Sequence, residues 1–251
     1  MTSTMRSFVV TDTFLLGTIT SYLAAASDLL SKLPVDRLGQ VIYRLEDARW
    51  RRQAVFICGN GGSAATSIHF ASDLAKGAMA ENKPAIMARS LCENTSLVTA
   101  WANDTSYDHV FTQCLEPWIK SGDVLIAISG SGNSQNVINA VAMAQAVGAT
   151  TIGFTGFDGG KLEDIVDICI TVPSDSMEQI EDVHLLLCHL ITCCLRETRP
   201  GDIHRPTSRS LLFATRNSKK IDRRDKVYAG VHTAPDTRVE NPSVARVTSP
   251  D

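Results

Sequence analysis

The feature that most constrains the fold is an alternation between short apolar runs and segments with helical spacing. The apolar runs are Gln53–Cys58, Ala85–Ala88, Val124–Ser129, Thr150–Phe154 and Ile168–Val172. Helical stretches separate most of them, and a long helical segment, Asp182–Arg196, closes the series. Strands that are apolar on both faces and are separated by helices indicate a parallel sheet covered by helices on both sides. We therefore predict an α/β fold of three layers around a parallel five-stranded sheet.

The sequence divides into three parts. Apolar residues with helical spacing run from Thr11 to Leu33, and a second helical stripe follows Pro34. We predict an N-terminal helical segment at 1–34, which packs on the core or on another subunit, and the α/β domain at 35–198. Residues 199–251 are rich in Arg, Thr, Ser, Asp and Pro. Such a segment has little to bury, so we predict a disordered tail, with a basic interaction tail as the alternative.

Composition limits the binding partners and the cellular compartment that we expect for the protein. The chain has 251 residues, 44% of them hydrophobic, and a formal net charge of -3, which gives no reason to expect nucleic acid or an anionic membrane. Seven scattered cysteines without framework spacing fit reduced thiols in a cytosol. No run approaches the roughly 18 apolar residues of a membrane span, and the first ten residues lack the core of a secretory signal. We expect a cytoplasmic protein.

A glycine-rich loop, Gly59–Ser63 (sequence GNGGS), follows the first predicted strand. The helical segment after this glycine loop carries His69 and Asp73. Glycine lets a backbone approach a ligand closely, and a helix N-terminus offers free N–H groups to an anion. His69 and Asp73 are four residues apart, so on a helix they share one face. We predict a cradle for a polar ligand that leads into a pair able to bind metal or move protons.

The glycine loop also fits the dinucleotide fingerprint G-x-G-x-x-A at Gly59–Ala64. That fingerprint requires an acidic residue about 20 residues further on, to hold the ribose. Here the second strand ends in Ala88-Arg89-Ser90. Arg89 could meet the phosphate of NADP, so a Rossmann dehydrogenase remains a weaker alternative.

A second loop, Ser129–Ser134 (sequence SGSGNS), joins the third strand to a helix predicted from Gln135 to Val147. Three hydroxyls and several backbone N–H groups gather at the start of that helix. Many donors, little bulk and the positive end of a helix dipole suit a phosphate monoester. The alternative is an ordinary turn, since Ser and Gly are common turn residues. We predict that this serine loop binds phosphate.

The last helix begins with a third group of polar residues: Glu178, Glu181, His184 and His189. Glu181 and His189 would lie about 80° apart around a helix and about 12 Å apart along it. Glu181 and His189 could reach one ligand only if their side chains extend toward each other or if the helix begins irregularly. His184 is about 140° from His189 and should face elsewhere. A histidine on an apolar helix is usually a core residue, but two acids and two histidines this close favour a site.

Together these motifs resemble the SIS (sugar isomerase) family and, more narrowly, its phosphoheptose isomerases. The resemblance runs from about Phe14 to Arg196 and implies a flavodoxin-like SIS fold. It implies an aldose–ketose isomerase that converts sedoheptulose 7-phosphate to D-glycero-D-manno-heptose 7-phosphate through an enediol. It rests on Gly59–Ser63, His69-Phe70-Ala71, Ala102-Asn103-Asp104, Ser129–Ser134, Thr155-Gly156, Asp158–Lys161, Glu181–His184 and His189.

The resemblance also implies roles for single residues. The proton-transfer pair falls at Asp73 and His189. One zinc ion per active site would have its ligands at His69, Asp73, Glu181 and His189. The substrate-binding positions are Asn60, Gly61, Gly62, Ser63, Asp104, Ser129, Gly130, Ser131, Ser134 and Glu181. Two positions depart from the family pattern, because Asp73 replaces the usual Glu and Glu181 the usual Gln. Family members are homotetramers with sites at subunit interfaces, so we expect the same here.

Two alternatives within the family stay open. A non-catalytic SIS module that binds phosphosugar as a regulator, or binds a replication initiator, would keep both loops and lose the acid–base pair. This chain keeps both histidines and carboxylates, which favours the enzyme. An isomerase for a different phosphosugar is the other alternative, because of the departures at Asp73 and Glu181.

Overall fold

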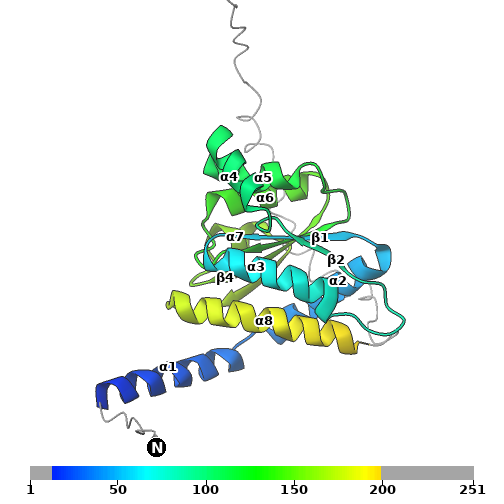
Figure 1. Cartoon of the computed structure of the whole chain (residues 1–251). Helices are drawn as coiled ribbons and strands as arrows, with labels where there is room; N and C mark the ends of the chain where they lie inside the picture. The colour runs from blue at the N-terminus through cyan, green and yellow to red at the C-terminus, as the bar shows by residue number, and fades with distance from the viewer. Residues whose placement is uncertain (1–12, 199–251) are drawn as a thin grey trace, which may run out of the picture. The chain divides into compact units, whose positions relative to one another are not determined.

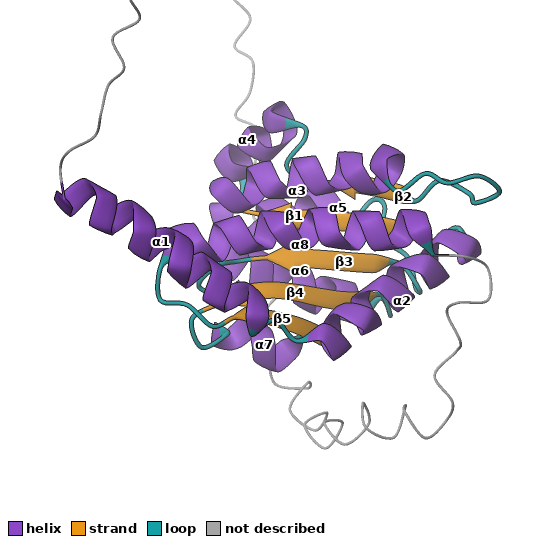
Figure 2. Cartoon of the chain, turned by 90° about the horizontal axis from the view of Figure 1, so that it is seen from below, coloured by secondary structure: helices purple, strands orange, loops and turns teal. Residues whose placement is uncertain are grey.

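The computed structural model describes residues 13–198, which fold around a parallel five-stranded sheet (Figures 1 and 2). The strands are β1 (Ala54–Gly59), β2 (Met87–Ser90), β3 (Val124–Ile128), β4 (Thr150–Gly156) and β5 (Ile168–Val172). Their order is β2-β1-β3-β4-β5, and every neighbouring pair is parallel. The predicted α/β class and parallel five-stranded sheet are confirmed, and the strand order is that of flavodoxin-like folds.

Helices cover both faces of the sheet. The helices of the described residues are α1 (Thr13–Ser31), α2 (Val35–Arg51), α3 (Gly62–Ser72), η1 (Asp73–Gly77), α4 (Thr95–Asp104), η2 (Tyr107–His109), α5 (Val110–Leu115), α6 (Gln135–Ala146), α7 (Gly160–Ile165) and α8 (Met177–Glu197). Side chains of α2, α3, η1 and α8 form one hydrophobic core with one face of the sheet. Side chains of α5, α6 and α7 form a second core with the other face. Alternate strand residues serve the two cores: Ile57 and Ile126 face the first, and Phe56 and Leu125 the second.

The strand order predicts a ligand site at the carboxyl ends of β1 and β3. β1 lies between β2 and β3. The connection from β1 leads to β2 on one side, and the connection from β2 returns to β3 on the other side of β1. In open α/β sheets ligands bind at such a switch point, outside the carboxyl ends of the strands. Gly59 pairs with Ile128, so the glycine loop and the serine loop leave the sheet at the same level.

The structure differs from the sequence prediction at several boundaries. Helix α8 begins at Met177, five residues before the predicted Asp182, because the Ser176 hydroxyl accepts a hydrogen bond from the Gln179 N–H at 3.4 Å and caps the helix. Strand β2 begins two residues later than predicted, because its pairing with β1 starts where Met87 meets Ala54. Helix α3 continues as a π-helical turn, which no sequence signal announced.

Helix α1 lies within the predicted N-terminal segment and is largely exposed. Leu29 is its buried residue, whereas Phe14 and Leu23 are 82% and 64% exposed. The Tyr22 hydroxyl donates a hydrogen bond to Asp182 Oδ2 at 2.6 Å, which raises the pKa of Tyr22 to about 12. By length and apolar composition alone α1 could cross a membrane, whereas the sequence predicted no membrane span. Core helices of soluble proteins and signal sequences share these two properties. The predicted tail, 199–251, lies outside the described residues.

Candidate active site

The glycine loop is shaped by close approaches that only glycine permits. Gly61 has a φ of +53°, a conformation that favours glycine. A Cβ on Gly59 would lie 2.7 Å from the Ser63 Cβ, and one on Gly62 would lie 2.6 Å from the Glu181 carboxylate oxygens. Glu181 on α8 therefore reaches over the first residue of α3. A carboxylate is favourable at the N-terminus of a helix, which explains its place there.

Asn60 connects the glycine loop to the start of helix α6. Asn60 and Asn136 exchange two amide hydrogen bonds of 2.9 Å, and Asn136 is 2% exposed. The Tyr107 hydroxyl also donates to Asn60 Oδ1 at 2.9 Å. Asn136 and Tyr107 are not among the site residues predicted from the sequence. Asn136 is the second residue after the serine loop, whereas nothing in the sequence pairs Tyr107 with Asn60.

The serine loop is held by its own hydrogen bonds and by the loop after β4. Ser129 Oγ and Ser134 Oγ lie 3.2 Å apart, and the Asn133 N–H donates to Ser131 Oγ at 3.2 Å. Gly132 has a φ of +64°, and a Cβ there would collide with the Gly159 carbonyl oxygen. The loop thus presents hydroxyls and the free N–H groups of α6 at one place, as an anion site requires.

Three side chains on α3, η1 and α8 form a group that could hold a metal ion: His69, Asp73 and His189, called the histidine–aspartate group below. The Asp73 Oδ2 atom lies 3.2 Å from His69 Nε2 and 3.7 Å from His189 Nε2. The two Nε2 atoms are 2.9 Å apart, and the rings meet edge to face. The histidines are about half exposed and Asp73 is 25% exposed, so a ligand can reach them.

Close packing of η1 against α8 brings this group together. Asp73 is the first residue of the π-helical turn, whose i+5 hydrogen bond runs from the Ala78 N–H to the Asp73 carbonyl at 2.8 Å. A Cβ on Gly77 would lie 3.1 Å from Thr192 Cγ2, so the bare glycine lets α8 approach. π-Helical turns often occur at functional sites.

The other predicted residues lie apart from the histidine–aspartate group. Glu181 is at Gly62, and Asp104 is exposed at the end of α4, where it accepts a hydrogen bond from Asn103 Nδ2 at 2.9 Å. His184 faces elsewhere, as the helical angle predicted. Its ring is 1% exposed, its Nε2 lies 3.0 Å from the Thr155 carbonyl oxygen, and burial lowers its pKa to about 4.

Comparison with known proteins places this arrangement in a family. The SIS domain profile matches residues 21–156. A probable phosphoheptose isomerase of Thermoplasma acidophilum is 38% identical over 176 residues, which are 70% of this chain and 96% of that protein. The chain belongs to the SIS domain family. Another relative, the phosphoheptose isomerase of Aliarcobacter butzleri, is 44% identical over 137 residues, or 55% of this chain and 72% of that protein.

Solved structures agree with this place in the SIS family. A phosphoheptose isomerase from Neisseria gonorrhoeae has a TM-score of 0.68 and 32% identity, and the match covers 73% of this chain and 100% of that one. The NanR protein of Vibrio vulnificus has a TM-score of 0.54 at 16% identity over 84% of this chain and 69% of its own, which shows a shared fold alone. The chain is a phosphosugar isomerase, and the non-catalytic alternative is not favoured.

Proposed function

We propose that this SIS protein interconverts sedoheptulose 7-phosphate and D-glycero-D-manno-heptose 7-phosphate. The observation that carries the proposal is the histidine–aspartate group, in which the Asp73 carboxylate lies within 3.7 Å of two imidazoles whose Nε2 atoms are 2.9 Å apart. Relatives named phosphoheptose isomerases, 38% and 44% identical, support the choice of a heptose phosphate. No nicotinamide is needed, because an aldose–ketose isomerisation is a proton transfer within one molecule.

Two loops would bind the substrate. The serine loop offers the hydroxyls of Ser129, Ser131 and Ser134, together with the N-terminus of α6, to the phosphate. The sugar would contact the glycine loop, Asp104 and Glu181. Because Glu181 lies at Gly62, we assign it to the sugar rather than to the histidine–aspartate group.

The proton transfer needs a base and a relay. Asp73 would remove a proton from C1 of the ketose and return it to C2. His189 would give a proton to the oxygen on C2 as the enediol forms, and would take the proton from the oxygen on C1 as the aldehyde forms. The Asp73–His189 contact of 3.7 Å allows one group to support the charge of the other.

The donor set of the histidine–aspartate group fits zinc. Two imidazoles and one carboxylate match the three protein ligands of catalytic zinc sites, which leave one position open. When bound, zinc would act as a Lewis acid that polarises the substrate's carbonyl oxygen. Asp73 would then share its two carboxylate oxygens between the ligand role and the base role.

We also propose a cytoplasmic homotetramer with sites at subunit interfaces. Exposed Phe14 and Leu23 on α1 support an apolar contact with a second copy of the chain, since large exposed apolar surfaces mark interaction sites. Sedimentation velocity of the purified chain measures its mass directly. Leu23→Glu should lower that mass, and a monomeric wild type would contradict the proposal.

Incubation of the purified chain with sedoheptulose 7-phosphate tests the reaction. We expect the aldose phosphate to appear by NMR, faster with added Zn²⁺ and slower with a chelator. A panel of other ketose and aldose phosphates tests which substrate is preferred. The panel is needed because Asp73 and Glu181 depart from the family pattern, which could change the substrate. Turnover of a different phosphosugar alone would correct the substrate, and no turnover of any would contradict the proposal.

A further inference from the structure

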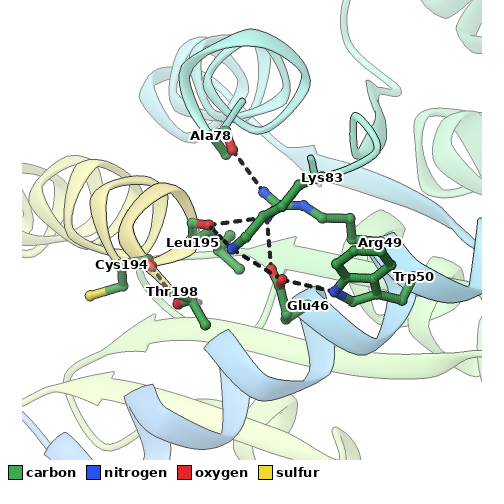
Figure 3. A network of polar contacts seen from close by, with 8 residues as sticks. All are labelled: Glu46, Arg49, Trp50, Ala78, Lys83, Cys194, Leu195 and Thr198. Carbon is green, nitrogen blue, oxygen red and sulfur yellow. Dashed lines mark hydrogen bonds and ion pairs between the residues drawn. The ribbon is translucent and has the colours of Figure 1, made fainter. Parts of the chain in front are cut away.

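A cluster of charged side chains is buried beside helix α2 (Figure 3). Glu46 and Arg49 come from α2, and Lys83 joins them from the segment before β2; their side chains are 7%, 1% and 3% exposed. Glu46 accepts a hydrogen bond from Arg49 Nη1 at 2.8 Å and forms an ion pair with Lys83 Nζ at 3.2 Å. Buried ion pairs often stabilise a fold no better than apolar side chains of the same volume. This buried ionic cluster therefore points to a role beyond stability.

The cluster holds the ends of two helices. Arg49 Nη1 donates to the Leu195 carbonyl at 3.0 Å and Arg49 Nη2 to the Ala78 carbonyl at 2.9 Å. Lys83 Nζ also donates to the Leu195 carbonyl, at 3.0 Å. Leu195 is in the last turn of α8, and Ala78 directly follows η1. The last carbonyls of a helix have no partner within it, so one guanidinium joins two helix ends that need donors.

These two helices carry the histidine–aspartate group. Ala78 is bonded to Asp73 through the π-helical turn, at 2.8 Å from N–H to carbonyl oxygen. Leu195 is six residues after His189 on the same helix, which is about 9 Å along a rigid rod. A shift of α8 against η1 at the cluster would therefore change the distance between His189 and Asp73.

We infer that Arg49, supported by Glu46 and Lys83, is a positioning residue that fixes η1 against α8 and so sets the geometry of the histidine–aspartate group. This inference rests on the proposed metal site and proton-transfer pair. A metal site tolerates errors of only about 0.5 Å in its ligands, so a link between the two helices that carry them matters more than its contribution to stability.

Arg49→Lys tests the inference in the full chain. Lysine keeps the positive charge next to Glu46, but its single compact head cannot bridge two carbonyls as the planar guanidinium does. We expect the dissociation constant for Co²⁺, followed by its visible absorption, to rise about tenfold, as for residues that orient metal ligands. The turnover number should fall and KM for the phosphosugar should hold, because the serine loop is untouched.

Arg44→Lys is the matched control. Arg44 is also on α2 and donates to Thr150 Oγ1 at 2.9 Å and to the Gly122 carbonyl, away from η1 and α8. It should lower thermal stability without changing Co²⁺ binding. Equal weakening of Co²⁺ binding in both variants, or none in Arg49→Lys, would overturn the inference. If Arg49→Lys is insoluble, Lys83→Met takes its place, because it removes one donor to the Leu195 carbonyl. Lys83→Met should also weaken Co²⁺ binding, and unchanged Co²⁺ binding would overturn the inference. A wild type that binds no Co²⁺ would instead overturn the metal site itself.

Discussion

The serine loop and the histidine–aspartate group are built in opposite ways. The serine loop is six consecutive residues between the fully buried strand β3 and helix α6, with a hydrogen bond between the Ser129 and Ser134 hydroxyls and one from the Asn133 N–H to Ser131 Oγ. The histidine–aspartate group joins residues 120 positions apart, and its histidines are half exposed. One site is a property of a short segment, and the other a property of helix packing.

The difference has a consequence for the effect of distant changes. The serine loop depends on β3, on α6 and on the neighbouring loop after β4, against which Gly132 packs. The histidine–aspartate group depends on the packing of Gly77 against Thr192, next to Asp73, and on the Arg49 bridge at the far ends of η1 and α8. We therefore expect catalysis to be more sensitive than phosphate binding to changes elsewhere in the protein.

Asp73→Asn should give the largest effect and separate the two regions. The amide is nearly isosteric but is a poor base, so the turnover number should fall by about 10²–10⁴, the usual contribution of a general base. Binding of inorganic phosphate, measured by calorimetry, should stay at the wild-type value. Asp73→Glu restores the residue usual in the family and should remain active. An active Asp73→Asn protein would remove Asp73 as the base.

Acid should destabilise the α8 region through His184. Burial lowers the pKa of His184 to about 4, whereas the unfolded chain binds this proton below about pH 6.5. Between these values the unfolded state holds the extra proton, so stability falls as pH falls. The free energy of unfolding should drop by about 3 kcal/mol from pH 7 to pH 4 through this residue. Urea titrations at several pH values should show this drop in the wild type and not in His184→Gln. Equal pH dependence of the free energy of unfolding in the two proteins would contradict the prediction.

Ser131→Ala should weaken substrate binding and leave the proton transfer intact. Loss of one hydrogen bond to a charged phosphate costs about 1.5–3 kcal/mol, so KM should rise by about tenfold to a hundredfold. Ser121→Ala, in the turn before β3, is the control and should leave KM unchanged. A turnover number that falls while KM holds would assign Ser131 to the chemistry instead.

Tyr107→Phe should give the smallest effect. It removes one of two donors to Asn60 Oδ1, a bond worth about 0.5–1.5 kcal/mol. Asn136 still holds Asn60, so activity should fall only a few fold by the same NMR assay. Tyr43→Phe on α2 controls for loss of a phenol. A loss as large as that of Asp73→Asn would show that Tyr107 takes part in the reaction.

The sequence predicted what local patterns determine. Apolar runs located all five strands to within two residues at their starts, and the SGSGNS segment announced a hydroxyl-rich loop before α6. Helical spacing placed His69 and Asp73 on one face and turned His184 away from His189. These features follow from the period of a helix or a strand and need no knowledge of distant neighbours.

What the sequence did not predict comes from contacts between distant segments. The π-helical turn at Asp73, the place of Glu181 at Gly62 and the Tyr107–Asn60 bond each depend on how elements pack. The buried Arg49 bridge could not be read from α2 either, because a charged residue in an amphipathic helix usually faces solvent. Family resemblance supplied the assignment of His189 to the same site as Asp73.

Solvent-deuterium incorporation into the substrate tests the central claim most directly. The wild-type chain, sedoheptulose 7-phosphate and Zn²⁺ are incubated in D₂O and followed by NMR. Proton transfer through an enediol by Asp73 predicts deuterium at the carbon next to the carbonyl, and Asp73→Asn should leave that carbon protonated. Absence of exchange in the wild type, with any phosphosugar and with metal supplied, would contradict the isomerase account of this site.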